Sequence, residues 1–228
     1  RIGPNGDLLD AQEFTLGWSF ARWPAVTELG GRWLVVWQRN LSHDNPNAQI
    51  YGAFVAADGT SPGQFLVDSL FTTSMYRGPQ VASKGDSALI VWEDERISTT
   101  ETEVVGRFIQ PNGTLLPGIT ITELPGNQFR TSVAWDGSEF VIAYQDQRNR
   151  ISALDILDSR VDLFVSRVSG TGTVIDPDGF VFAAWEGTEV YPAVASANGI
   201  TLIAGSLLLN EPPYAALRIG YELVDASI

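Results

Sequence analysis

Short apolar runs, separated by turns rich in Gly, Asn, Asp and Pro, follow one another along the whole chain. Several runs alternate apolar and polar positions, and others are continuously apolar over roughly four to eight residues, which is typical of half-buried and fully buried β-strands. No stretch has the periodicity of an amphipathic helix. The pattern therefore predicts an all-β chain.

The runs recur with a period of about fifty residues, and each unit opens with a strand, a turn and a second strand. These openings are PAVTELGGRWLVVWQRN (24–40), PQVASKGDSALIVWEDER (79–96), SVAWDGSEFVIAYQDQR (132–148) and PAVASANGITLIAGSLLLN (192–210). A third strand follows in every unit, and a fourth follows in the first three. We align the second strands on Trp37, Trp92, Tyr144 and Ala204. Four strands in each unit predict a β-propeller of four-stranded antiparallel blades.

The units predict one propeller domain over residues 1–228. Its blades are expected at about 22–70, 77–124, 130–185 and 190–228. The chain starts with RIGPNGDLLDAQEFTL, which matches the end of a third strand, its turn and a fourth strand in 107–122.

The last unit stops after its third strand, so we expect residues 7–16 to supply the outer strand of the fourth blade. This strand would close a four-bladed ring and leave no open sheet edge. The alternatives are that the chain forms part of a larger ring, or that two copies form eight blades.

Composition excludes several kinds of partner and site. The formal net charge of −13 disfavours nucleic acid and anionic membranes as partners. The absence of cysteine excludes disulfides, thiolate metal sites and cysteine nucleophiles, and the single histidine, His43, excludes a multi-histidine metal site within the chain. No apolar stretch is long enough for a transmembrane segment.

The second and third units resemble repeats of about fifty residues in large secreted and surface proteins of bacteria. The residues that carry the resemblance are LIVWEDER with VVGRFIQPNGT, and FVIAYQDQR with LFVSRVSGTGT. The first unit departs from the pattern at Arg39, and the fourth lacks its Trp, Asp and Arg. The resemblance implies a β-propeller that is secreted or displayed on a bacterial cell surface, and implies no particular activity.

Charged residues follow the second strands of the second and third units: Glu93, Asp94, Arg96, Asp146 and Arg148. In a blade the start of the first strand lies beside the end of the second. We therefore expect Arg77 to pair with Glu93 or Asp94, and Arg130 to pair with Asp146. Arg96 and Arg148 are expected to fold over the same corner. The repetition of this cluster favours a structural role over a catalytic one.

The residues before each first strand are expected to share one face, called the top face, with the long loops between second and third strands. The candidate ligand-binding residues there are Arg22, Trp23, Tyr76, Arg77, Phe129, Arg130 and Tyr191. Exposed aromatic rings could stack on sugars, and the arginines could attract a carboxylate or an acidic sugar. The alternative is that most of these rings pack between blades and the arginines pair with carboxylates.

Calcium is the one cofactor that the chain suggests, through oxygen ligands at Asp44, Asn45 and Asn47. No complete calcium-loop motif is present, so solvated loop charges explain these residues equally well. We expect no catalytic residues, because motifs for nucleophilic, phosphate and metalloprotease chemistry are absent. The carboxylates that a glycosidase would need are already assigned to arginines.

These observations favour a non-catalytic extracellular module, structural or interacting, that binds a protein partner or a larger assembly through its top-face loops. The alternative is a carbohydrate-binding or carbohydrate-processing propeller.

Overall fold

A computed structural model describes residues 2–7, 15–16, 20–40, 48–69, 78–95, 101–149, 161–183, 187–209 and 216–225. Within these ranges the chain is all-β, as expected, and forms fifteen strands. None of the described residues form a helix with the length and apolar character that a membrane crossing requires.

The strands form four antiparallel sheets in chain order, which we call blades 1 to 4. Blade 1 holds β1 (Ala21–Leu29), β2 (Arg32–Asn40), β3 (Ala48–Val55) and β4 (Gln64–Ser69). Blade 2 holds β5 (Gln80–Ser83), β6 (Ala88–Asp94), β7 (Glu103–Ile109) and β8 (Leu115–Thr120). Blade 3 holds β9 (Gln128–Trp135), β10 (Glu139–Asp146), β11 (Asp162–Ser169) and β12 (Phe180–Ala183). Blade 4 holds β13 (Gly187–Ala197), β14 (Ile200–Leu209) and β15 (Ala216–Asp225).

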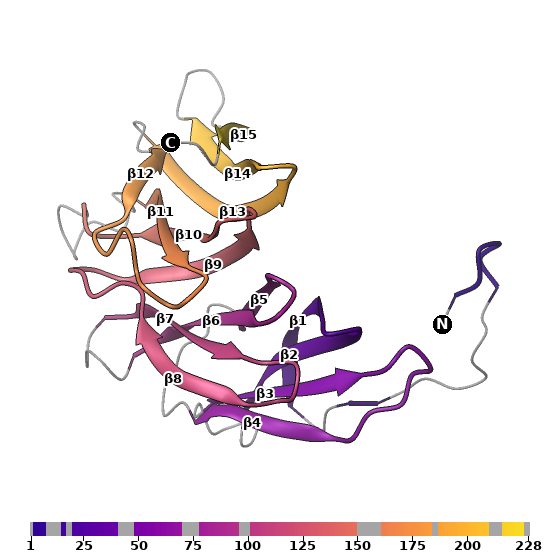
Figure 1. The fold of residues 1–228 in the computed structure, drawn as a ribbon. Helices are drawn as coiled ribbons and strands as arrows, with labels where there is room; N and C mark the ends of the chain where they lie inside the picture. The colour runs from indigo at the N-terminus through magenta and orange to yellow at the C-terminus, as the bar shows by residue number, and fades with distance from the viewer. Residues whose placement is uncertain are drawn as a thin grey trace.

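The blades stack face to face along an arc (Figure 1). The first strands β1, β5, β9 and β13 contact one another in that order and line the inside of the arc. Successive side chains of a strand point to opposite sides of the sheet. The continuous apolar runs in β6 and β10 therefore give both interior blades two apolar faces. We call the face toward the following blade the forward face, and the face toward the preceding blade the backward face.

The hydrophobic core lies between these faces. Leu34 and Val36 on the forward face of blade 1 pack in one cluster with Ile90 and Trp92 on the backward face of blade 2. The same alternation places a second cluster between blades 2 and 3 and a third between blades 3 and 4. Burial of apolar surface at these junctions is therefore what holds the blades together.

The strand register corrects one alignment made from the sequence. Ala25 pairs with Val36 in blade 1, and Ala193 pairs with Ala204 in blade 4, so Ala204 is equivalent to Val36. Gly205 therefore occupies the column of the buried Trp37. A Cβ at position 205 would lie 2.4 Å from Cδ1 of Leu163, so the leucine fills the space that an aromatic ring takes in other blades.

The described residues do not show the expected closed ring. Blade 4 has three strands, and residues 8–14 of the proposed outer strand lie outside the described residues. Residues 2–7 lie far from β15, beyond the other end of the arc (Figure 1). Among the described strands, β13 and β1 do not form one of the substantial contacts. The described strands form four sheets in an open arc.

Candidate functional site

Three first strands are interrupted by a β-bulge at the same position near their start. The register shifts there, and one non-glycine residue in each bulge has a left-handed backbone: Trp23 (φ 52°), Arg130 (φ 55°) and Tyr191 (φ 59°). Such a conformation costs a non-glycine residue about 1–2 kcal/mol and is found disproportionately at functional sites. We call these three residues the axial bulges, because they lie on the strands that line the inside of the arc.

Two of the axial bulges are in direct contact. The Arg130 guanidinium lies 4.2 Å from the centroid of the Tyr191 ring, a cation–π arrangement. Oε1 of Gln145 accepts a hydrogen bond from the Tyr191 backbone N–H at 3.1 Å and another from Nη1 of Arg130 at 3.5 Å. The Arg130 backbone N–H donates to the Glu93 carboxylate. Residues at the ends of second strands thus hold the bulge of the following blade.

The contact leaves polar and aromatic groups available to a ligand. The Tyr191 side chain is 43% exposed, and the Arg130 side chain is half-buried. The Nε atom of Arg130 is buried and has no hydrogen-bond partner. Trp23 is also half-buried, and at the equivalent place in blade 2 stands Gly78, whose Cβ would lie 2.6 Å from Cβ of Trp23.

The other predicted binding residues divide into two groups. Arg22 is exposed and pairs with Gln38, whereas Phe129 is buried and packs in the interior. Five candidates lie outside the described residues: Tyr76, Arg77, Asp44, Asn45 and Asn47. In the part of the chain that the structure describes, no three acidic, histidine or cysteine side chains gather as a metal site.

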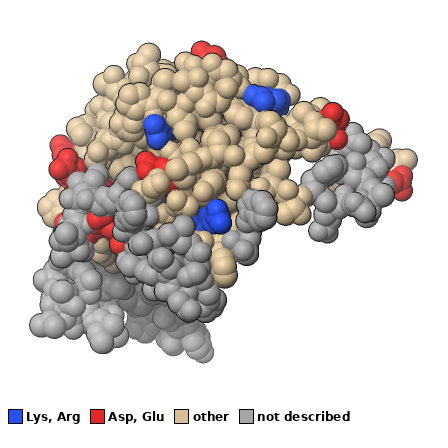
Figure 2. Space-filling view, turned by 90° about the horizontal axis from the view of Figure 1, so that it is seen from below, with Lys and Arg blue, Asp and Glu red and all other residues tan. Residues whose placement is uncertain are grey.

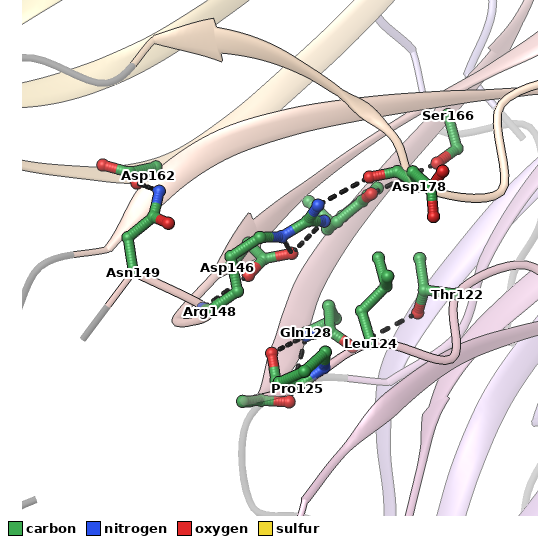
Figure 3. A network of polar contacts seen from close by, with 12 residues as sticks. Thr122, Leu124, Pro125, Gln128, Asp146, Arg148, Asn149, Asp162, Ser166 and Asp178 are labelled. Carbon is green, nitrogen blue, oxygen red and sulfur yellow. Dashed lines mark hydrogen bonds and ion pairs between the residues drawn. The ribbon is translucent and has the colours of Figure 1, made fainter. Parts of the chain in front are cut away.

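The residues of the predicted corner are in contact in blade 3, but their pairing differs from the expected one. Asp146 is fully buried and accepts hydrogen bonds from the Arg148 backbone N–H at 2.7 Å, from Nε at 2.9 Å and from Nη2 at 2.5 Å (Figure 3). Nη1 of Arg148 donates to the Asp178 carbonyl at 2.6 Å, and the guanidinium lies 3.9 Å from the Phe164 ring centroid. The Asp-x-Arg motif is therefore a local ion pair that connects the end of β10 to the loop before β12.

The expected pair of Arg130 with Asp146 is wrong. Asp146 and Gln145 are neighbours in β10 and point to opposite faces of the blade. Arg130 lies on the side of Gln145, so its guanidinium contacts the amide rather than the carboxylate. Arg96, the equivalent of Arg148 in blade 2, lies outside the described residues.

The ends of the second and third strands bring buried carboxylates together, which sequence reasoning missed. Asp94 pairs directly with Glu103 across β6 and β7, and both side chains are buried. Burial raises the pKa of the Glu103 carboxyl to about 7, although it accepts hydrogen bonds from Oγ1 of Thr122 and the Leu124 backbone N–H. In the sequence Glu103 is the last residue of a polar stretch (94–103), and nothing there distinguishes it from a solvated charge.

A cavity of about 390 Å³ lies beside these carboxylates, between β4 of blade 1 and the backward face of blade 2. Its lining includes Asp68, Asp94 and Trp92, with Gly106 and Gly118 in its wall. The indole N–H of Trp92 is buried without a hydrogen-bond partner. Two carboxylates and an aromatic ring around one cavity make it a second candidate site.

Charged side chains do not add a further site on the face seen in Figure 2. The basic and acidic residues described on that face are scattered among uncharged ones.

Comparisons with known proteins support the propeller fold. No protein-family model and no curated protein sequence matches the chain. Among solved structures, an endo-arabinanase of glycoside hydrolase family 43 from Bacillus licheniformis has a TM-score of 0.50 at 12% identity, covering 87% of this chain and 72% of that one. An α-L-arabinofuranosidase from Fusarium graminearum has a TM-score of 0.54 at 14% identity, covering 91% and 63%. A neuraminidase-like protein from A/bat/Guatemala/164/2009 has a TM-score of 0.57 at 10% identity, covering 90% and 54%.

These matches correct the functional expectation drawn from the sequence. The chain resembles in fold several arabinanases and an arabinofuranosidase, and no finding supports the expected interaction module. The comparisons therefore favour the carbohydrate-binding or carbohydrate-processing alternative over the interaction module.

Proposed function

We propose that this chain is a carbohydrate-binding propeller that holds a glycan at the axial bulges. The observation that carries the proposal is the contact of Arg130 with the half-exposed Tyr191 ring on two adjacent left-handed bulges. The solved structures of similar fold support it, because most of those compared are named as enzymes of arabinan and arabinofuranosides.

The geometry suits a sugar for two reasons. An exposed aromatic ring offers a flat apolar surface for the C–H groups of a pyranose or furanose. The Arg130 guanidinium keeps several donors that Gln145 does not use, and these can bind a sugar hydroxyl or carboxylate. The folded chain already contains the strained backbone, so the Tyr191 ring and the Arg130 guanidinium are held in place before the ligand binds.

Isothermal titration with arabinan oligosaccharides and with sialylated oligosaccharides tests this proposal. We expect one class to bind, and we expect Tyr191→Ala to weaken that binding by at least about tenfold, which corresponds to ~1.4 kcal/mol. Phe180→Ala is the matched control, because Phe180 is similarly exposed on β12. No binding by the wild type, or equal binding by Tyr191→Ala, would contradict the proposal.

Glycoside hydrolysis is the second candidate function, and the carboxylates near the cavity favour it. A glycosidase needs one carboxyl group that keeps its proton near neutral pH and a second that stays ionised. Glu103, with its pKa raised to about 7, stands directly opposite Asp94, which lines the cavity together with Asp68.

Release of reducing ends from arabinan tests the second candidate. Asp94→Asn and Asp68→Asn should each lower the rate by roughly 100-fold or more if these groups act in proton transfer. Asp178→Asn, a change in a loop acid away from the cavity, should leave the rate unaltered. Absence of any release between about pH 4 and 8, spanning the ordinary and raised carboxyl pKa range, would exclude hydrolysis of this substrate.

The finer architecture and location belong to the same proposal. Each of the four sheets forms one blade, and we infer that the four blades are part of a larger ring. The greater length of the similar glycan enzymes supports this inference. The resemblance to bacterial surface repeats and the acidic composition support a location outside the cell. Adding a chelator to the titration would test whether calcium contributes.

A further inference from the structure

The forward face of blade 4 is built like a blade junction but has no blade against it. Leu34, Leu89, Val141 and Leu202 occupy the same column in blades 1 to 4, two residues before the column of Val36. The first three are buried by the following blade, with at most 4% of the residue exposed, whereas Leu202 is 40% exposed.

The third strands repeat this contrast. Ile50, Val104, Leu163 and Ile219 occupy one column, as their pairing with the second strands shows. The first three are completely buried, and Ile219 is 74% exposed. The fourth blade therefore keeps the apolar side chains of a junction at positions where they face solvent.

The uncovered patch is large. Its exposed apolar members are Ile200, Leu202, Ile219, Tyr221 and Leu223. With full side chains of this size covering on the order of 200 Å², these residues leave roughly 600 Å² of apolar surface in one patch, at the upper end of what soluble monomers show.

The backward face of blade 1 is uncovered near the turn between β1 and β2, although Trp37 and Ala53 on the same face are buried. Trp33 occupies the column of Ala88, Phe140 and Thr201, which are buried, but it is 51% exposed. Val26 next to it is also exposed. Together they add roughly 200 Å² of apolar surface.

We propose that the forward face of blade 4 binds the backward face of blade 1 of a second copy of this chain, and that two copies close one ring through two such junctions. Every interior junction joins a forward face to a backward face, and the described strands leave exposed apolar residues on one face of each kind, in blade 4 and in blade 1. Because the ends of its own arc lie apart, they meet their counterparts on another copy (Figure 1).

Area favours a closed pair over an open chain of copies. One junction would bury roughly 800 Å², the size of a non-specific contact, whereas two junctions would bury roughly 1,600 Å², the size of a stable interface. A head-to-tail contact closes into a ring when its rotation permits, and otherwise extends into a filament. The charge of −13 on each copy opposes association, so added salt should strengthen it.

Native mass spectrometry and light scattering after gel filtration test this proposal on the full chain. We expect the wild type at twice the 24.8 kDa chain mass, with a larger dimer fraction at higher salt. Ile219→Asp and Trp33→Asp should each give a folded monomer, because both residues are exposed within one copy. Leu116→Asp, an exposed leucine on β8 away from both end faces, should remain a dimer.

Mixing the two variants identifies which faces meet. Ile219→Asp keeps an intact blade 1 face, and Trp33→Asp keeps an intact blade 4 face, so a mixture can form only one junction. It should therefore associate far more weakly than the wild type, while each variant alone stays monomeric. If Ile219→Asp does not fold by circular dichroism, Leu223→Asp replaces it. The proposal is overturned by a wild-type monomer at all concentrations and salt levels, by a dimer that survives both substitutions, or by a mixture of the two variants that associates as tightly as the wild type.

Discussion

Replacing Asp146 with alanine isolates the energetic role of the corner in blade 3. Asp146 is fully buried and accepts three hydrogen bonds from Arg148, two of them from the guanidinium. Its loss leaves a backbone N–H unpaired and removes the counter-charge of a guanidinium that is only 18% exposed.

The expected loss of stability depends on the contacts that Arg148 retains in the variant. Breaking a fully buried ion pair costs about 3–5 kcal/mol, and an orphaned neutral donor about 1–3 kcal/mol. Arg148 retains the Asp178 carbonyl, the Phe164 ring and some contact with water. We therefore expect Asp146→Ala to lower the free energy of unfolding by about 2–4 kcal/mol, measured from urea transitions at unchanged slope.

A double-mutant cycle separates the pair from the packing around it. Arg148→Met keeps the stem over Phe164 but removes the charge, so the double variant should cost less than the sum of the single ones. Asp86→Ala removes a carboxylate that is 75% exposed from its pair with Lys84 and should change stability little. A loss below about 0.5 kcal/mol for Asp146→Ala, or strict additivity in the cycle, would refute a structural corner.

Two other predictions concern single buried positions. The folded chain holds the Glu103 proton more tightly than the unfolded chain, so this stabilisation is complete below pH 4.5 and is lost as pH rises through about 7. The loss of unfolding free energy amounts to about 3 kcal/mol. Glu103→Gln should remove that part of the pH dependence, measured by urea titration at several pH values. Identical pH profiles for the wild type and Glu103→Gln would contradict the prediction. Gly205→Ala should destabilise by about 1–3 kcal/mol because its methyl group meets Leu163. Gly118→Ala should not, because its methyl group would lie at an ordinary contact distance of 3.8 Å from the Gly106 carbonyl oxygen. Equal melting temperatures for the two variants would contradict the assigned column.

The sheets could be predicted from sequence because their signals are local. Alternation of apolar residues and the Gly, Asn and Asp turns locate the strands, and the period groups them into blades. Trp37, Trp92 and Tyr144 are buried between neighbouring strands as a core position requires. The repetition of the corner residues from unit to unit likewise predicted a structural role, which the Asp146 variant tests.

The details of the site depend on the register with which neighbouring strands pair. Aligning the units by sequence similarity does not reveal this register, because a bulge shifts it by one residue. Matching arginines by residue type placed Arg130 with Arg22, but the bulge puts it in the column of Trp23 and Tyr191. Prolines carry the missing signal: an equal count from Pro24, Pro79 and Pro192 brings Trp37, Trp92 and Gly205 into one column.

The left-handed conformation itself had no sequence signal, since Trp, Arg and Tyr rarely adopt it. The pairing of Asp94 with Glu103 was equally hidden, because it joins residues on either side of a polar loop. Both features arise only when the strands are assembled.

Each axial bulge is a position at the inner edge of its blade, here called a socket, at which the side chain can be exchanged. A bulged residue stands outside the ladder, so an indole, a guanidinium and a phenol occupy equivalent sockets without altering the strand pairing on either side. The sockets are nevertheless not independent, since Trp23 fills the volume next to Gly78 and leaves the second blade with no side chain there. Side chains at these positions can therefore be substituted while the scaffold stays unchanged, provided that neighbours fit together, as Trp23 does with Gly78 and Arg130 does with Tyr191.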